Sequence, residues 1–267
     1  MSERPIAVID SGLGGLTVLR ALIDLLPDEP FVYFGDTGRF PYGPKPDRHV
    51  TKYALEMADL LADQDMKMLV VACNRVSSVA LDDLRRAYDI PVIGVIEPGL
   101  RAAVKVTQSR RVGVIGTVGT IASGAYQRAA DASGAAITLT CAACPGFAEF
   151  VEAGDVDSEE VHVLAERLLA PVRAAAVDTL ILGCTHYPLL ARTIGDVMGR
   201  NVVLVSSADE TAFEVRLLLG GTGHTRPSGL EAPRRVFLTS GDLTTFRTLG
   251  ARFLGPEVET VEAWEWS

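Results

Sequence analysis

The sequence predicts an α/β fold: two pseudo-symmetric, doubly wound domains with mostly parallel sheets and an active site between them. Short apolar runs alternate with amphipathic segments of helical period along the 267 residues. Most of these runs are continuously apolar, which is typical of strands whose two faces are both covered by helices. At roughly 150 residues per domain, the length allows one large domain or two ordinary ones.

Nine apolar runs are expected to be strands, and nine strands in one chain predict two sheets. The expected strands are residues 6–9, 31–34, 68–72, 92–96, 112–115, 137–140, 179–182, 202–205 and 236–239. Helices are expected between them, for example at residues 16–26, 47–63, 77–88, 125–133, 158–175 and 208–219. Residues 219–233 are rich in Gly, Pro and Thr, which predicts a long surface loop.

A weak internal repeat supports two domains of like topology. Residues 6–11 resemble residues 112–117, and residues 69–73 resemble residues 180–184, at nearly the same separation along the chain. We interpret the repeat as two βα units of one duplicated architecture.

Composition and charge exclude several classes of protein. Hydrophobic residues make up 48% and charged residues 22%, which is ordinary for a globular chain and argues against disorder. The net charge of −9 repels phosphate backbones, so we expect no nucleic-acid partner. The apolar runs are far shorter than the roughly 18 residues that span a bilayer, so no membrane segment is expected. The first residues lack the apolar core of a secretory signal, which predicts a cytoplasmic protein with reduced thiols.

Cys73 and Cys184 are the most informative residues. Each ends an apolar strand and precedes small or polar residues and a helix, and ligands of open α/β sheets bind at the carboxyl ends of strands. A helix N-terminus beside a thiol also raises its reactivity. Either cysteine alone is more simply a small buried apolar residue. Two cysteines at equivalent places of a repeat favour a functional pair.

The chemistry that suits two facing thiols is proton transfer. A reducing compartment argues against a disulfide, and His186 beside Cys184 lacks the spacing of a metal motif, so no metal is expected. Inverting a stereocentre requires that a proton leave one face and another return to the opposite face. Two acid/base groups, one from each domain, would do this without moving around the substrate.

Other segments are weaker candidates. The turn Asp10-Ser-Gly-Leu-Gly-Gly15 could bring backbone close to a ligand and an anion to a helix N-terminus, or it could be purely structural. Thr17 stands where a dinucleotide fingerprint needs glycine. Gly35-Asp-Thr37 and Pro41-Tyr-Gly43 form a polar loop, although a turn is the simpler interpretation of the second.

Three further side chains could be either functional or structural. Cys141 and Cys144 form a CxxC motif that could support redox or metal chemistry, although bystander thiols are the simpler interpretation. Glu152 by itself is expected to be a solvated carboxylate at a helix end.

Five motifs in order resemble the glutamate racemases of the aspartate/glutamate racemase family. They are Asp10-Ser-Gly-Leu-Gly-Gly-Leu16, Gly35-Asp-Thr37, Pro41-Tyr-Gly43, Ala72-Cys-Asn74 and Gly183-Cys-Thr-His-Tyr-Pro188. The resemblance runs from about residue 5 to about residue 218. It implies a racemase without a cofactor that interconverts L- and D-glutamate for peptidoglycan, and it leaves a homodimer open. It also implies a first domain of residues 1–97 and 207–267 and a second domain of residues 98–206.

The resemblance assigns roles to individual residues. Cys73 and Cys184 match the two catalytic cysteines, and three further residues match groups that assist the thiols: Asp10, Glu152 and His186. The positions that match substrate contacts are Asp10, Ser11, Tyr42, Gly43, Asn74, Thr185 and His186.

One departure from the family pattern bears on the substrate. Arg75 and Val76 stand where the family usually has Thr-Ala. Arg75 could pair with a substrate carboxylate or fill the cavity. The alternatives are therefore a related enzyme acting on aspartate or on a malonate- or hydantoin-type acid, and an inactive substrate-binding paralogue.

Overall fold

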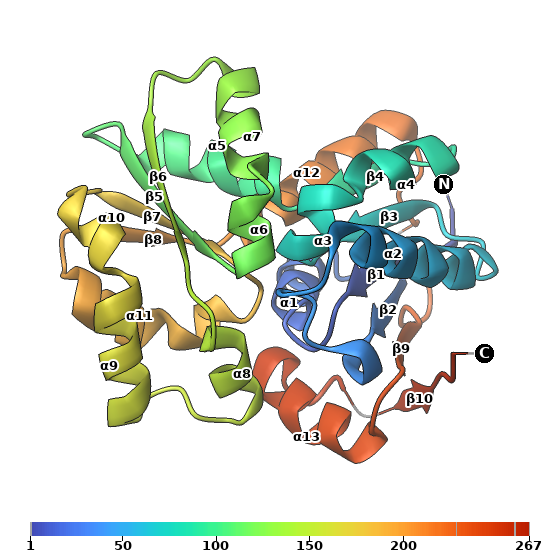
Figure 1. The fold of residues 1–267 in the computed structure, drawn as a ribbon. Helices are drawn as coiled ribbons and strands as arrows, with labels where there is room; N and C mark the ends of the chain where they lie inside the picture. The colour runs from blue at the N-terminus through green and yellow to red at the C-terminus, as the bar shows by residue number, and fades with distance from the viewer. Residues whose placement is uncertain (1, 228, 259, 267) are drawn as a thin grey trace.

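The structure, a computed structural model, describes residues 2–227, 229–258 and 260–266. Its strands form a six-stranded sheet in the order β10-β9-β2-β1-β3-β4 and a four-stranded sheet in the order β6-β5-β7-β8 (Figure 1). The strand pairs of the described residues are parallel. The predicted α/β fold with two parallel sheets is confirmed. We call the part built on the six-stranded sheet the first lobe and the part built on the four-stranded sheet the second lobe.

The elements of the first lobe are β1 (Ile6–Asp10), α1 (Leu16–Leu25), β2 (Phe31–Gly35), η1 (Thr37–Arg39), α2 (Asp47–Ala62), β3 (Met68–Val71), α3 (Asn74–Val79), α4 (Leu81–Ala87), β4 (Val92–Gly94), α12 (Ala208–Thr222), β9 (Arg235–Thr239), α13 (Leu243–Leu254) and β10 (Val261–Ala263). Those of the second lobe are α5 (Ile96–Val106), β5 (Arg111–Gly116), α6 (Val118–Ala122), α7 (Ala125–Ser133), β6 (Thr138–Ala143), α8 (Phe147–Glu152), α9 (Glu159–Leu168), α10 (Ala170–Ala174), β7 (Thr179–Gly183), η2 (Tyr187–Leu190), α11 (Ala191–Met198) and β8 (Val203–Val205).

All nine expected strands are present within a few residues of their predicted bounds. The prediction overextended β4, because Ile96 begins α5 instead of ending the strand. It also missed β10, a three-residue edge strand that is too short to show a pattern.

The helices deviate more from the prediction. The expected helix at 77–88 is two helices that meet at Ala80, and the one at 158–175 breaks at Leu169 because Pro171 in the next turn cannot continue a helical hydrogen-bond ladder. The expected loop at 219–233 begins late, since α12 runs to Thr222; Ser228 of this loop lies outside the described residues. No range was predicted for α5, α6, α8, α11 and α13, although a helix was expected after Cys184 and another that ends at Glu152.

The internal repeat corresponds to a repeated topology. If the four strands of each repeat are counted in chain order, both repeats have the spatial order 2-1-3-4. This is β2-β1-β3-β4 in the first sheet and β6-β5-β7-β8 in the second. The repeated segments coincide with β1 and β5 and with β3 and β7. The predicted domain boundaries near residues 97 and 207 stay a prediction.

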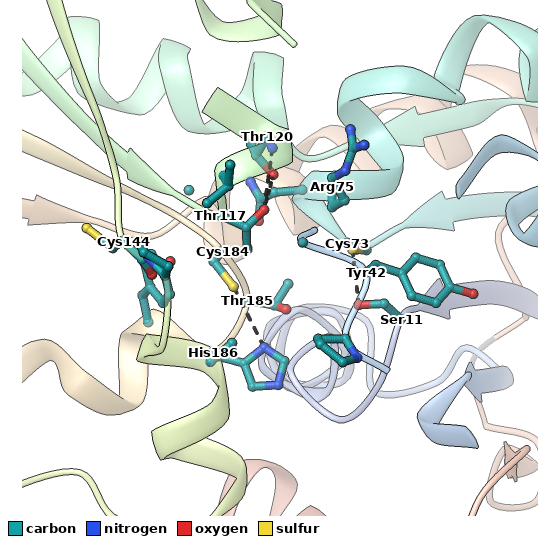
Figure 2. A pocket seen from close by; sticks show the side chains of 18 of the residues that line it. Ser11, Tyr42, Cys73, Arg75, Thr117, Thr120, Cys144, Cys184, Thr185 and His186 are labelled. Carbon is teal, nitrogen blue, oxygen red and sulfur yellow. Dashed lines mark hydrogen bonds between the residues drawn. The ribbon is translucent and has the colours of Figure 1, made fainter. Parts of the chain in front are cut away.

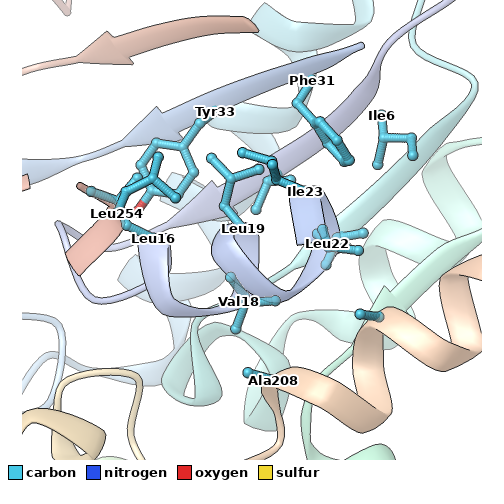
Figure 3. Close-up of a cluster of buried hydrophobic side chains, with 14 of the residues drawn as sticks. Ile6, Leu16, Val18, Leu19, Leu22, Ile23, Phe31, Tyr33, Ala208 and Leu254 are labelled. Atoms are coloured by element: carbon cyan, nitrogen blue, oxygen red, sulfur yellow. The ribbon is translucent and has the colours of Figure 1, made fainter. Parts of the chain in front are cut away.

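Both faces of each sheet are covered, which explains the continuously apolar strands. Each sheet has one hydrophobic cluster on each side. In the cluster of Figure 3, Leu19, Leu22 and Ile23 of α1 pack towards Ile6 and Phe31 of the sheet. These helix residues recur at the three- to four-residue spacing of one helical face, and burying each such side chain contributes about 1.5–3 kcal/mol.

Within the described part of the chain, every helix is too short or too polar to traverse a bilayer.

Candidate active site

The strand order brings the ends of four strands to the candidate site. In each sheet the first strand of the repeat has its neighbours on opposite sides: β1 lies between β2 and β3, and β5 lies between β6 and β7. The connections from these two strands therefore run in opposite directions along the sheet. Such a switch in strand order opens a crevice at the carboxyl ends of the strands, where ligands bind. Ser11 and Cys73 follow β1 and β3, whereas Thr117 and Cys184 follow β5 and β7.

Cys73 and Cys184 line the same cavity between the two lobes (Figure 2). Its volume is about 100 Å³, enough for several water molecules or a small ligand. The first lobe contributes Ser11, Phe40, Pro41, Tyr42, Gly43, Pro44, Cys73, Asn74 and Arg75 to its lining. The second lobe contributes Thr117, Val118, Thr120, Cys144, Pro145, Ala148, Glu149, Gly183, Cys184, Thr185, His186 and Tyr187.

Cys73 is a protonated thiol in this environment. It precedes the first residue of α3, and its thiol donates a hydrogen bond to Ser11 Oγ at 3.3 Å. Burial, followed by the negative charge of Asp10, raises the pKa of Cys73 to about 12. The sequence predicts that the helix N-terminus lowers the pKa of this thiol, but desolvation outweighs that effect.

His186 joins the second thiol to a carboxylate. Its Nδ1 lies 3.7 Å from Cys184 Sγ, and its Nε2 lies 2.9 Å from Glu152 Oε1. Burial lowers the pKa of His186, but the hydrogen bonds to Cys184 and Glu152 outweigh burial and raise it to about 10. At neutral pH the ring is protonated, so one N–H donates to the sulfur and the other to the carboxylate.

Glu152 is not the solvated carboxylate that its position at a helix end suggests. It is the last residue of α8, yet its side chain is only 18% exposed because it turns towards His186. The pairing joins positions 34 residues apart, so local sequence carries no signal for it.

Asp10 lies behind the cavity wall, fully buried at the end of β1. Its Oδ2 accepts the backbone N–H of Gly12 at 3.0 Å, whereas Oδ1 has no hydrogen-bond partner among the described residues. Burial raises the pKa of Asp10, and the positive charge of His186 opposes this rise. Asp10 therefore acts on Cys73 through its charge, from outside the cavity lining.

The glycine-rich turn after β1 closely approaches the other lobe. A Cβ atom at Gly14 would lie 2.3 Å from Thr185 Oγ1 and 2.6 Å from His186 Nδ1, so only glycine fits there. Of this turn, Ser11 reaches the cavity. Within the turn, the Gly12 N–H donates to the carboxylate of Asp10 at 3.0 Å, and a role of the turn in binding a ligand stays a prediction.

The remaining predicted substrate contacts lie in the cavity wall. Tyr42 donates its hydroxyl hydrogen bond away from the cavity, to Asp36. Asn74 Nδ2 donates to Tyr126 Oη at 2.9 Å, which leaves Asn74 Oδ1 without a partner among the described residues. Gly43 and Thr185 also line the cavity.

Arg75 points away from both sulfur atoms (Figure 2). Its guanidinium donates to Asp47 Oδ1 at 2.5 Å, to the Lys45 carbonyl at 2.9 Å and, across the lobes, to the Gly119 carbonyl at 3.4 Å. The side chain is only 3% exposed, and it borders the cavity without filling it.

The CxxC cysteines lie in different surroundings. Cys144 borders the cavity, whereas Cys141 lies in β6 and accepts a hydrogen bond from Gln127. Burial raises the pKa of Cys141 to about 11 and that of Cys144 to about 12, which keeps both thiols protonated at neutral pH and disfavours redox chemistry. Within the described residues, no group of three or more His, Cys, Asp or Glu side chains could hold a metal ion.

Sequence reasoning missed Thr117 and Thr120. Thr117 caps α6 by accepting the N–H of Thr120, and both residues line the cavity. The signal was present, because the internal repeat makes Thr117 the counterpart of Ser11.

A family model for Asp/Glu/Hydantoin racemases matches residues 6–214. The chain belongs to this family. Among its curated relatives, the glutamate racemase of Parafrankia sp. (strain EAN1pec) is 51% identical over 98% of this chain and 94% of the relative. The glutamate racemase of Acidothermus cellulolyticus is 52% identical over 97% of this chain and 98% of the relative.

Solved structures of the Asp/Glu/Hydantoin racemase family match the whole fold. Glutamate racemase isoform RacE1 from Bacillus anthracis has a TM-score of 0.94 at 40% identity, covering 99% of this chain and 98% of that one. Glutamate racemase from Francisella tularensis, solved in complex with D-glutamate, has a TM-score of 0.92 at 33% identity with the same coverage.

The protonation of His186 gives a pH-dependent prediction. Since its pKa rises from 6.5 to about 10, the proton stabilises the fold fully below about pH 6.5, and this contribution is lost as the pH rises through about 10. Nitrogen NMR of the imidazole should show a titration midpoint near 10. Glu152→Gln should lower the midpoint by weakening the acceptor, whereas Glu149→Gln on the same helix should leave it unchanged. A midpoint near 6.5 in the wild type would contradict the pairing.

Proposed function

We propose that the chain is a glutamate racemase that interconverts L- and D-glutamate by proton transfer between two cysteines, without a cofactor. The observation that carries this proposal is the presence of Cys73 and Cys184, one from each lobe, in one cavity. Relatives named glutamate racemase are about half identical over nearly the whole chain, which supports glutamate as the substrate. We further propose that the product supplies D-glutamate for peptidoglycan.

In the proposed mechanism, one cysteine acts as a thiolate that removes the α-proton, while the other, as a thiol, donates a proton to the opposite face. The roles exchange in the reverse direction. The resulting carbanion can delocalise only into the substrate carboxylate. The site must therefore stabilise developing negative charge with donors that are already in place in a low-dielectric cavity.

The two sides of the cavity are electrostatically different. Cys73 has a raised pKa and a hydrogen bond to Ser11, which supports a neutral thiol as its resting form. Cys184 lies beside a protonated imidazole. We propose that Asp10, Glu152 and His186 adjust the protonation of the two thiols, with His186 acting directly on Cys184.

The cavity wall offers groups for the substrate carboxylates. Helix α3 begins at Asn74 and Thr117 caps α6, and the N-terminus of a helix favours anions. We propose that backbone N–H groups near residues 11, 43, 74 and 185 bind the carboxylates.

We also propose two domains, residues 98–206 and residues 1–97 with 207–267. The packing of α5 on β7 and of α12 on α1 supports this division.

The function is tested by incubating the pure protein with D-glutamate and no added cofactor. Circular dichroism should decay to zero as the racemic mixture forms. A parallel panel in deuterium oxide should show α-proton exchange for glutamate and much slower exchange for aspartate. Exchange of aspartate alone, or turnover that requires pyridoxal phosphate, would refute the assignment. Rescue of a bacterium that requires D-glutamate tests the role in peptidoglycan.

Replacement of either thiol should cripple racemisation. Cys73→Ser and Cys184→Ser should each lower kcat by about 10²–10⁴, because a hydroxyl is a far weaker acid than a thiol and so gives up its proton, whether to ionise or to donate, much less readily. Cys141→Ser is the matched control, since this thiol lies outside the cavity, and it should retain wild-type kcat. Full activity in either of the first two variants would overturn the two-base scheme.

Replacement of Arg75 tests whether its guanidinium stabilises the fold or binds the substrate. Arg75→Thr should keep racemisation within about tenfold of wild type, and should lower the free energy of unfolding in urea by about 1 kcal/mol, since its partner Asp47 is largely exposed. Asp47→Asn, which keeps the carbonyl contacts, should have a smaller effect. A rise of roughly a hundredfold in KM for glutamate would instead show that Arg75 binds a substrate carboxylate.

A further inference from the structure

A buried carboxylate organises the loop that carries Tyr42 and Gly43. Asp36, at the start of this loop, is fully buried. Its oxygens accept hydrogen bonds from four side chains, those of Arg39, Tyr42, Ser240 and Trp266. A buried carboxylate needs such donors to offset its lost hydration. Two of the four lie 204 and 230 positions further along the chain, so the loop depends on distant residues.

Trp266 makes the most extensive of these distant contacts. Its Nε1 donates to Asp36 Oδ1 at 2.9 Å. The guanidinium carbon of Arg39 lies 3.8 Å from the centre of the indole and 3.9 Å from the centre of the Tyr53 ring. The cation is thus held against two aromatic rings, a stabilising arrangement for a partly desolvated arginine.

The last strand directs Trp266 to this position. β10 pairs with β9, and the Trp264 N–H continues the ladder by donating to the Thr239 carbonyl at 2.8 Å. The indole of Trp266 then packs edge-on against Phe34, with ring centres 5.4 Å apart. Trp264 is 39% exposed and its ring packs against Trp266, not against the loop.

We propose that Trp266 is a positioning residue for the substrate cavity: it holds Asp36 and Arg39, and through them the loop that places Tyr42 and Gly43 in the cavity wall. The inference rests on the proposed function only in naming glutamate as the occupant. Removing the indole takes one donor from Asp36 and one ring from Arg39, so the wall loosens while both thiols keep their own contacts.

Steady-state kinetics test this proposal first. Trp266→Ala should raise KM for D-glutamate about tenfold while kcat stays within about threefold, because the loop shapes the cavity and does not transfer protons. Trp264→Ala is the matched control, a tryptophan two residues away on the same segment, and should leave KM unchanged.

Thiol alkylation gives a second measurement that needs no turnover. Iodoacetamide labelling of Cys73 and Cys184, followed by mass spectrometry of each site, should be several-fold faster in Trp266→Ala than in the wild type, because a looser wall opens more often. Trp264→Ala should label at the wild-type rate. If the wild type does not racemise glutamate, the proposed function fails, and labelling alone decides the role of Trp266.

The outcomes separate positioning from plain stabilisation. If Trp266→Ala does not fold, Trp266→Phe decides by the same two measurements; it keeps a ring over Arg39 but lacks the N–H, and should give intermediate values. Unchanged KM and unchanged labelling in the folded variant would overturn the proposal, even if its urea midpoint falls. A fall in kcat with unchanged KM would also overturn it.

Discussion

Parallel strands present their carboxyl ends along one edge of a sheet, and the site depends on two such edges sharing one cavity. Each repeat contributes a residue after its first strand and another after its third, so Ser11 and Cys73 lie opposite Thr117 and Cys184. Neither sheet could by itself bring two thiols to one cavity from two different lobes. A duplicated βα architecture does so directly, because the same position of each repeat carries the cysteine.

Burial affects the ionisable groups around Cys73 and those around Cys184 differently. Desolvation disfavours charge on Cys73 and Asp10, and raises the pKa of both. On the other side, His186 overcomes the same desolvation through its hydrogen bonds to Cys184 and Glu152, which keep the imidazole positive. A low-dielectric site strengthens this asymmetry, since charges interact more strongly where water is excluded. Cys73 and Cys184 are therefore alike in topology and unlike in environment.

The sequence predicts what depends on local pattern and misses what depends on distant pairing. Strands, sheets and both cysteines follow from apolar periodicity and from the repeat, and the repeat could have located Thr117 as well. Glu152 is assigned a role by the family resemblance alone, and Trp266 was not singled out at all, since their partners are 34 and 230 positions away and leave no local pattern. The direction of Arg75 was equally inaccessible, because its acceptors come from the start of α2, the loop before it and the opposite lobe.

The two lobes approach each other closely at three glycines. A Cβ atom at Gly14 would meet Thr185 at 2.3 Å, one at Gly43 would meet Thr117 at 3.0 Å, and one at Gly119 would lie 2.6 Å from the Gly43 carbonyl. Each of these contacts crosses from one lobe to the other, so the lobes lie closer together than side chains would permit. Proton transfer to a carbon atom tolerates little error in distance, and a misplacement of about 1 Å can slow a reaction roughly a hundredfold. Glycine at these positions thus permits the close approach of the lobes that the proposed proton transfer needs.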